Sequence, residues 1–243
     1  MASLYGLIGY PLSHSFSPAY FHHKFAKQGI DAIYQAYPIL TINDFPALLN
    51  ANPSLKGLNV TIPYKEQILH YLDEMDAAAE TIGAVNCIKI TSDRLIGYNT
   101  DHIGFADSLR PLLRKQHTHA LVLGTGGAAK AVMYALHQLG IDCKTVSRTS
   151  GDITYDNLND EIIQSHRLII NTTPLGMYPD ANQCPSLPYK AIGQGHLLYD
   201  LIYNPEETLF LKQGSEAGAA IKNGYEMLIL QAEASWQIWN TTR

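Results

Sequence analysis

The sequence predicts an α/β protein of two domains. Apolar runs typical of strands alternate with amphipathic runs typical of helices, which predicts mainly parallel sheets with helical cover. The alternation restarts after a predicted helix around 101–113, and residues 119–150 read as a strand, a glycine turn, a helix and a strand, the size of one βαβ unit. We expect an N-terminal, mainly parallel α/β domain over 1–101 and a Rossmann-type dinucleotide-binding domain over 102–225, with a helix at 226–243 packing back on the first domain.

The first half supplies alternating elements in a regular order. Expected strands are 5–11, 32–39 and 55–63, expected helices are 17–30, 42–52, 65–74 and 76–83, and two short strands with a polar turn at Thr91–Arg94 fill 87–101. Pro63 ends the third strand because proline cannot donate to a ladder, and a helix is expected to start at Lys65.

The second half continues with parallel strands that end in polar residues. The βαβ unit is followed by predicted strands at 166–174 and 195–205. The helix at 227–239 is apolar on several sides, so it must be buried against other elements.

Composition and charge exclude several classes of protein. Hydrophobic residues make up 46% and charged residues 16%, as in ordinary globular proteins. The net charge is −5, and the only basic cluster is Arg110, Arg114 and Lys115, so we expect no nucleic-acid partner. No apolar run approaches the ~20 residues that span a bilayer, and the N-terminus lacks a basic start and cleavage site, so no membrane association is expected.

The cysteines and histidines do not indicate a metal site. Cys87, Cys143 and Cys184 are odd in number and far apart, which is typical of reduced thiols and predicts a cytoplasmic protein. The ten histidines include no H-E-x-x-H pattern, and His22-His23 and His117-x-His119 lack a partner set. We expect no metal.

A glycine-rich turn between a strand and a helix predicts a dinucleotide site. Gly124-Thr-Gly126-Gly127-Ala128-Ala129 fits G-x-G-x-x-[GA]. The first glycine permits the tight turn, the second lets the backbone approach a pyrophosphate, and Ala129 lets the helix pack on the strand. A plain tight turn is the alternative, but the flanking strand and helix favour the dinucleotide.

The end of the next strand indicates the type of dinucleotide. NAD is usually held there by an acidic residue, about 20 residues beyond the glycines. This chain has Ser147-Arg148-Thr149 instead, and a guanidinium can hold the oxygens of a 2′-phosphate bidentately. NADP is therefore favoured over NAD, although an arginine at a strand end can also be merely solvated.

Four polar segments in the first half lie where loops meet strands or helices. Each alone has a structural alternative, because Ser17 before Pro18 could cap a helix and Asn86 could fix a turn. Together they offer hydroxyls, amides and opposite charges that suit a small, hydroxylated, anionic ligand. The segments run from Gly9 to Pro18, Asn59 to Lys65, Gly83 to Asn86 and Tyr98 to Asp101.

In order along the chain, these residues and others resemble the motifs of the shikimate dehydrogenase family. The matching motifs between Pro11 and Gln231 are P-x-x-H-S-x-S-P, N-V-T-x-P-x-K, G-A-V-N, N-T-D, G-x-G-G-A, S-R-T, N-T-T-P-x-G-M, D-x-x-Y-N-P and M-L-x-x-Q. The resemblance covers almost the whole chain. It implies reversible NADPH-dependent reduction of 3-dehydroshikimate to shikimate, on the route to chorismate and the aromatic amino acids.

The resemblance also implies roles for single residues. Lys65 and Asp101 would form the catalytic pair, Ser15 and Ser17 would bind the substrate carboxylate, and His14 would orient their loop. Ring hydroxyls would be held by Asn59, Thr61, Asn86, Asp101 and Gln231, with Tyr203 nearby.

The cofactor side follows in the same way. Met177 and the loop around Gly224 would lie near the nicotinamide. The residues implied to bind NADP are Gly124, Gly126, Gly127, Ala128, Ser147, Arg148, Thr149, Thr172, Met177 and Gly224.

Three positions depart from the family's pattern. Lys130 stands where arginine is frequent, and Glu226 stands where glycine is usual. Asp152 stands where a second arginine for the 2′-phosphate is common, and we expect its charge to weaken the preference for NADP.

Two other functions remain open on the sequence. One is an NAD-dependent quinate/shikimate dehydrogenase, which Asp152 favours and Arg148 disfavours. The other is a non-catalytic dinucleotide-sensing module, which would need neither Lys65 nor Asp101. In either enzyme the partner is a small-molecule substrate, and the chain would be a monomer or a homodimer.

Overall fold

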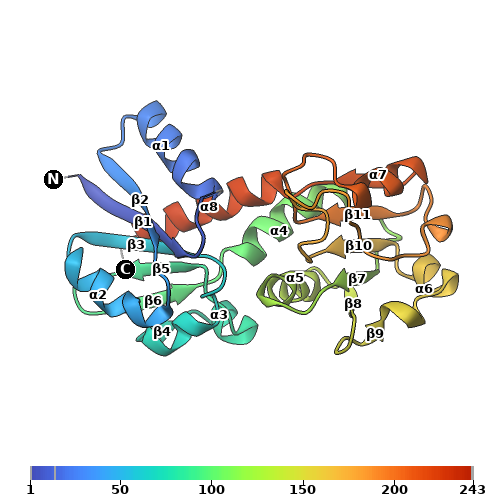
Figure 1. Ribbon diagram of the computed structural model, residues 1–243, viewed down its shortest axis with the longest axis horizontal. Coiled ribbons are helices and arrows are strands. Elements are labelled where there is room, and N and C mark those ends of the chain that lie inside the picture. The colour runs from blue at the N-terminus through green and yellow to red at the C-terminus, as the bar shows by residue number, and fades with distance from the viewer. Residues whose placement is uncertain (1, 14, 242–243) are drawn as a thin grey trace. The chain divides into compact units, whose positions relative to one another are not determined.

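The chain divides into two compact units, each with its own sheet (Figure 1). The computed structural model describes residues 2–13 and 15–241, so His14 lies outside the described residues. The first unit consists of Met1–Asp101 together with Gln231–Arg243, and the second is His102–Leu230. No helix among the described residues is long and apolar enough to cross a membrane.

The first unit is built on a mixed six-stranded sheet in the order β2-β1-β3-β5-β6-β4. Its elements, in chain order and with η for a 3-10 helix, are β1 (Ser3–Gly9), α1 (Phe16–Gln28), β2 (Ala32–Pro38), η1 (Ile42–Asp44), α2 (Phe45–Ala51), β3 (Leu55–Val60), η2 (Gln67–Tyr71), β4 (Glu74–Met75), α3 (Ala77–Ile82), β5 (Cys87–Ile90), β6 (Leu95–Tyr98) and the part of α8 (Tyr225–Asn240) from Gln231 onward.

Parallel and antiparallel pairs share this sheet. β1 pairs in parallel with β2 and β3, and β4 pairs in parallel with β6. β5 runs antiparallel to both β3 and β6. The short polar turn between β5 and β6 makes these two strands a hairpin, the connection typical of antiparallel neighbours.

The helix predicted from Lys65 is wrong. The chain instead makes a turn at Lys65, a short 3-10 helix η2, and the edge strand β4. Asp73 explains the difference: its backbone N–H donates to the carbonyl of Leu95 at 3.0 Å, and its carboxylate accepts from the N–H of Leu95 at 2.7 Å. These long-range bonds to β6 replace the local bonds that would have continued a helix.

The first sheet is covered on both faces. One face packs on α2, η2 and α3 through Ile8, Leu58 and Ile88. The other packs on α1 and α8, where Tyr5 stacks on Trp239 with ring centroids 4.9 Å apart. In Figure 1, α1 and α8 lie together on this side of the sheet.

Gly57 in β3 makes room for the indole of α8. A Cβ atom at this position would lie 2.3 Å from the Trp239 ring, far inside van der Waals contact. The indole N–H of Trp239 donates to the carbonyl of Ile88 at 3.0 Å. The apolar helix of the sequence analysis is therefore seated directly on the sheet.

The second unit is a six-stranded sheet in the order β12-β11-β10-β7-β8-β9 in which every neighbouring pair is parallel. Its elements are α4 (Asp101–Leu109), η3 (Arg110–Leu112), β7 (His119–Leu123), α5 (Gly127–Gln138), β8 (Asp142–Ser147), β9 (Ile153–Thr154), η4 (Tyr155–Asn157), α6 (Asp160–Ser165), β10 (Leu168–Asn171), η5 (Tyr189–Ala191), β11 (Leu197–Asp200), α7 (Leu209–Glu216), β12 (Ala220–Lys222) and the start of α8.

This strand order confirms the predicted Rossmann-type sheet. The chain leaves β7 toward β8 on one side and later returns to β10 on the other, so a topological switch point lies between β7 and β10. Ligands of open α/β sheets bind outside the carboxyl ends of the strands at such a point. The buried residues of β7 alternate between two apolar cores, with Val122 in the core that includes α5 and Leu123 in the core that includes α6 and α7.

Candidate active site

A connected group of polar side chains is buried at one edge of the first sheet. β3 and β6 end at this edge, and β5 begins there because it runs antiparallel between them. The polar residues that meet at this edge, with those that α8 adds, are Asn59, Lys65, Asn86, Thr100, Asp101, Gln231 and Ser235.

Lys65 and Asp101 form the ion pair of this group. Nζ of Lys65 donates to Oδ2 of Asp101 at 2.7 Å. The carboxylate side chain is only 4% exposed, whereas the lysine side chain is 20% exposed. A buried carboxylate is tolerated when a cation and hydrogen bonds compensate its charge. The ammonium, which remains partly open to solvent, can also reach a ligand.

Asn86 joins the parts of the group. Its amide nitrogen lies 2.9 Å from Oδ1 of Asp101, 3.0 Å from the hydroxyl of Thr100 and 3.0 Å from Oε1 of Gln231. Its amide oxygen accepts from the backbone N–H of Thr100 at 2.6 Å. Asp101 is thus held on one oxygen by Asn86 and on the other by Lys65. Because Gln231 uses its oxygen here, its NH₂ group is the end that can reach a ligand.

Asn59 lies deeper than the sequence suggests. It is 8% exposed, and its NH₂ group donates to the carbonyl of Asn86 at 3.1 Å and to the hydroxyl of Ser235 at 2.9 Å. Its oxygen accepts from the hydroxyl of Tyr34 at 2.8 Å. Both amide hydrogens are therefore used within the protein.

Sequence reasoning gave no role to two members of the group, Thr100 and Ser235, or to Tyr34, which holds Asn59. Ser235 touches the hydroxyl of Thr100 at 3.2 Å, and the Tyr34 hydroxyl holds Asn59. Thr100 stood inside the N-T-D motif. Ser235 follows Gln231 by one helical turn, so Ser235 and Gln231 lie on one face of α8. Tyr34 gave no signal, since a tyrosine in an apolar strand is ordinary.

The two serines before and within α1 are half-buried. Ser15 occupies the N-cap position of α1, but its side chain makes no capping hydrogen bond. Ser17 follows in the first turn, so neither serine serves as the cap. Burial raises the pKa of Tyr34 well above its ordinary value, and a hydrogen bond with Ser17 acts in the opposite direction, which places Ser17 beside the buried group. Thr61, also half-buried, follows β3, and its N–H donates to the carbonyl of Ile8 at 2.9 Å.

The glycine turn of the second unit has the geometry of a phosphate cradle. Gly124 has φ +112°, a conformation that favours glycine, and a Cβ there would lie 2.7 Å from the hydroxyl of Thr172. Gly126 is the N-cap of α5 and has open space where a side chain would stand. Gly127 and Ala128 begin α5, whose first N–H groups are free of intrahelical partners.

The neighbouring strand ends are fixed by a buried carboxylate. Asp200 is fully buried and accepts from the amide of Asn171 at 3.1 Å, the N–H of Ile202 at 3.0 Å and the hydroxyl of Thr208 at 2.6 Å. Burial raises the pKa of Asp200 to about 6, and these hydrogen bonds act against the rise. Asn171 in turn accepts from the N–H of Thr173 at 3.0 Å. The loops after β10 and β11 are thereby tied together.

Three further predicted residues lie in loops of the second unit. Met177 is 48% exposed, and Tyr203 is half-buried, which raises its pKa. Gly224 approaches the residue after β11 so closely that a Cβ would lie 2.0 Å from the carbonyl oxygen of Leu201. Glu226, one of the departures from the family's pattern, pairs with Lys222. Ser147 is the last residue of β8, and Arg148 and Thr149, which follow it, are exposed.

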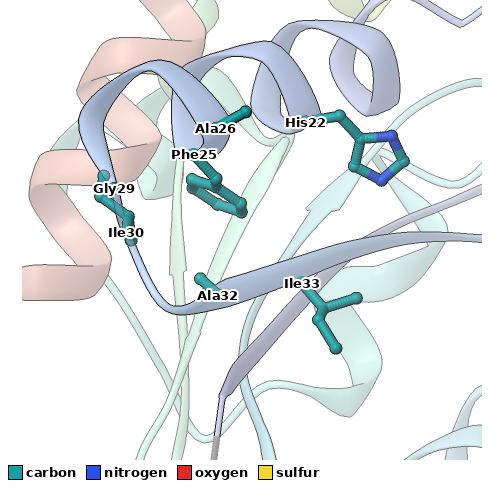
Figure 2. Close-up of a pocket in the computed structure, with 7 residues that line it drawn as sticks. All are labelled: His22, Phe25, Ala26, Gly29, Ile30, Ala32 and Ile33. Atoms are coloured by element: carbon teal, nitrogen blue, oxygen red, sulfur yellow. The ribbon is translucent and has the colours of Figure 1, made fainter.

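Two other features of the described residues can be set aside. No three histidine, cysteine, aspartate or glutamate side chains lie together as a metal site would require. A shallow hollow between α1 and β2 is walled mainly by apolar side chains, and Figure 2 shows His22 at one end of it and Ile33 on the strand. The hollow has one ionisable lining residue and none of the predicted site residues.

Comparison with known proteins identifies the family. The family model for the shikimate dehydrogenase substrate binding domain matches residues 7–88. A shikimate dehydrogenase (NADP+) of Methanococcus maripaludis is 38% identical over 257 residues, covering 97% of this chain and 91% of that protein. One of Carboxydothermus hydrogenoformans is 37% identical over 254 residues, covering 97% and 91%. The chain belongs to the shikimate dehydrogenase family.

A solved shikimate dehydrogenase shares the architecture. The crystal structure of the enzyme of Thermus thermophilus, in complex with NADP(H) and shikimate, superposes with a TM-score of 0.88 at 30% identity and covers 99% of this chain and 94% of that one. The resemblance inferred from the motifs is confirmed, and so is the α/β class with two sheets. Three motifs of the first half, N-V-T-x-P-x-K, G-A-V-N and N-T-D, contribute residues to the buried polar group at the sheet edge.

Proposed function

We propose that this chain catalyses the reversible NADPH-dependent reduction of 3-dehydroshikimate to shikimate. The observation that carries the proposal is the Lys65–Asp101 pair, held in place by Asn86 within a shikimate dehydrogenase fold. The product would serve the synthesis of chorismate and the aromatic amino acids.

The residues of the second unit fit the cofactor. The open backbone at Gly126 and the free N–H groups of α5 suit a pyrophosphate, and exposed Arg148 suits a 2′-phosphate. When bound, NADPH supplies the hydride that the ketone receives. The residues assigned to it are Gly124, Gly126, Gly127, Ala128, Ser147, Arg148, Thr149, Thr172, Met177 and Gly224.

The residues of the first unit bind and orient the substrate. Ser15 and Ser17 offer hydroxyls to the carboxylate, and neither is committed to capping α1. Thr61, Asn86 and Gln231 hold ring hydroxyls, and Tyr203 is the remaining residue assigned to the substrate. Because both amide hydrogens of Asn59 are used, we assign it chiefly to holding Asn86 and Ser235 in place.

Lys65 acts on the charge that develops during reduction. Addition of a hydride to a ketone places negative charge on the carbonyl oxygen, which requires a positioned cation or proton donor. The Lys65 ammonium is both, and the lysine side chain is 20% exposed, which allows a ligand to approach it. Asp101 fixes the ammonium through Oδ2, and in the direction of oxidation the same pair receives the hydroxyl proton.

Four assays of the unmodified protein, repeated with the variant Lys65→Met, test the proposal. Shikimate and quinate are each offered with NADP+ and with NAD+, and reduction of the nicotinamide is followed by absorbance. We expect the highest kcat/KM for shikimate with NADP+, and no comparable rate for Lys65→Met. Faster turnover of quinate with NAD+ would support the catabolic alternative, and binding of NADP+ without turnover of either substrate would support a sensing module.

A further inference from the structure

We propose that Asp152 is a positioning residue for NADP selectivity. It latches the turn after β8 onto Thr145 and so presents Arg148 to the 2′-phosphate. This inference rests on the proposed use of NADP. It reverses the expectation from the sequence, in which the charge of Asp152 repels the phosphate.

The turn is unusually compact. β8 and β9 pair in parallel, with Val146 opposite Ile153 and Ser147 opposite Thr154. Parallel neighbours normally need a crossover of a dozen or more residues, whereas here the chain folds back through 148–152. A turn this short can be ordered only if its backbone is held at several points.

Gly151 is the point of closest approach. A Cβ atom on it would lie 2.9 Å from the backbone nitrogen of Ser147 and 2.9 Å from the carbonyl oxygen of Thr145. Backbone atoms cannot move aside as the end of a side chain can. The turn is therefore pressed against β8 at a position that has no room for a side chain.

Ser147 holds the middle of the turn. Its hydroxyl oxygen accepts from the N–H of Thr149 at 3.2 Å and from the N–H of Ser150 at 2.8 Å. Hydroxyl-to-backbone bonds of this kind stabilise tight turns. They fix the backbone on the side of the turn that follows Arg148.

Asp152 closes the turn. Its Oδ2 accepts from the N–H of Thr145 at 2.8 Å and from the hydroxyl of Thr145 at 2.7 Å, and its own N–H donates to that hydroxyl at 3.0 Å. The same bonds lower the pKa of Asp152, so the carboxylate stays charged at neutral pH. Asp152 is exposed, but one of its two carboxylate oxygens, Oδ2, is thus committed to two donors on β8.

Arg148 is left to meet a ligand. It is exposed, and within the described part of the chain no salt bridge joins it to Asp152 or to any other carboxylate. An Arg148–Asp152 ion pair would have cancelled the charge that a 2′-phosphate requires. In the structure Asp152 instead binds Thr145 through Oδ2, and Arg148 stays exposed in the turn.

Substitutions at the latch separate positioning from repulsion. Asp152→Asn removes the charge but keeps an oxygen that can accept from Thr145, whereas Asp152→Ala removes both. Thr145→Val keeps the shape of a buried strand residue and the charge of Asp152, but removes the hydroxyl. Arg148→Ala is the reference for loss of the phosphate contact.

Calorimetric binding of two small probes gives the readout. Adenosine 2′,5′-bisphosphate and adenosine 5′-monophosphate differ only by the 2′-phosphate. The Kd of the monophosphate divided by the Kd of the bisphosphate therefore measures how much that group adds to binding. The full-length chain is used, and no turnover is needed. We expect Asp152→Asn to keep the ratio within about twofold of the unmodified protein. Asp152→Ala and Thr145→Val should each reduce it by about fivefold, the worth of one lost hydrogen bond, with unchanged binding of the monophosphate.

The outcomes distinguish failure of this inference from failure of the proposed cofactor. A higher ratio in both Asp152→Asn and Asp152→Ala, with no effect of Thr145→Val, would establish repulsion and overturn the latch. A drop in Arg148→Ala alone would overturn the latch and keep NADP as the cofactor. A ratio near one in the unmodified protein that is indifferent to Arg148→Ala would remove the NADP assignment itself. Unchanged monophosphate binding shows in each case that the variant is folded.

Discussion

The ammonium of Lys65 lies 2.7 Å from a carboxylate oxygen of Asp101 that is almost fully shielded from water. The other oxygen of the same carboxylate receives a hydrogen bond from Asn86. The lysine is therefore aimed by a buried anion that has no freedom to turn away. Substitution of Lys65 or of Asp101 should therefore have a defined effect on both turnover and stability.

Lys65→Met should fold and bind shikimate while losing most turnover. Methionine keeps much of the length of the side chain but offers no charge or proton to the substrate oxygen. Loss of one proton-transfer group typically costs ~10²–10⁴-fold in rate. Steady-state kcat with saturating shikimate and NADP+ measures the effect, with shikimate binding by calorimetry as the control. A kcat close to that of the unmodified protein would remove Lys65 from the mechanism.

The Lys65–Asp101 pair should also contribute to the free energy of unfolding. Removing Lys65 leaves the buried Asp101 without its cation, which commonly costs 3–5 kcal/mol for a fully buried pair. Because the lysine is partly exposed and Asn86 still donates, we expect about 1–3 kcal/mol for Lys65→Met. Adding Asp101→Asn should recover part of this loss. Urea unfolding of the two single variants and the double variant gives the coupling, and strictly additive effects would mean that the pair contributes nothing.

Gln231 should affect the substrate more than the cofactor. Its oxygen is bound to Asn86, so its NH₂ group is the free donor. Gln231→Ala should raise KM for shikimate by the equivalent of ~1–3 kcal/mol and change KM for NADP+ little. Gln231→Glu is the matched control, since it retains an oxygen for Asn86 but has no NH₂ group for the substrate. An effect confined to NADP+ would place Gln231 outside the substrate site.

Asp200 should make stability depend on pH in an unusual direction. Its folded pKa of about 6 lies above the ordinary 3.8, so between about pH 4 and pH 6 the folded chain keeps a proton that the unfolded chain has released. Stability from this group is therefore present below pH 4, falls as pH rises to about 6 and is level above that. The free energy of unfolding is measured at pH 4 and pH 7 for the unmodified protein and for Asp200→Asn. Between pH 4 and pH 7 the unmodified protein should lose about 2–3 kcal/mol relative to the variant. Divergence of the opposite sign would contradict the raised pKa.

Local signals in the sequence predicted much of the fold. The glycine turn at Gly124 and Gly126 sits between one strand and one helix, so its geometry is set by residues close in the chain. The same holds for the β5–β6 hairpin and its turn at Thr91–Arg94. The edge strand β4 was not predictable in this way, because it depends on bonds between Asp73 and Leu95, which are far apart in sequence.

The residues of the candidate site also divide into those with a local signal in the sequence and those without one. Lys65, Asn86 and Asp101 stand in motifs, and the structure brings them into one hydrogen-bonded group. Tyr34 contacts that group only across the unit, and nothing in its own neighbourhood indicates it, whereas Ser235 follows Gln231 by one turn of α8. Asp152 shows the reverse case: its place in a polar loop suggested a free charge, and only the contact with Thr145 reveals where that charge is held.

The course of the chain through the two units has a consequence for synthesis on the ribosome. Residues 231–241 complete the first unit, yet they are translated after the whole of the second. Until they emerge, the aromatic core around Tyr5 lacks Trp239, and Asn86 lacks Gln231. A nascent chain therefore cannot complete its first unit until the segment after the second unit has been made, and the hydrogen-bonded group around Lys65 and Asn86 gains Gln231 only at that point.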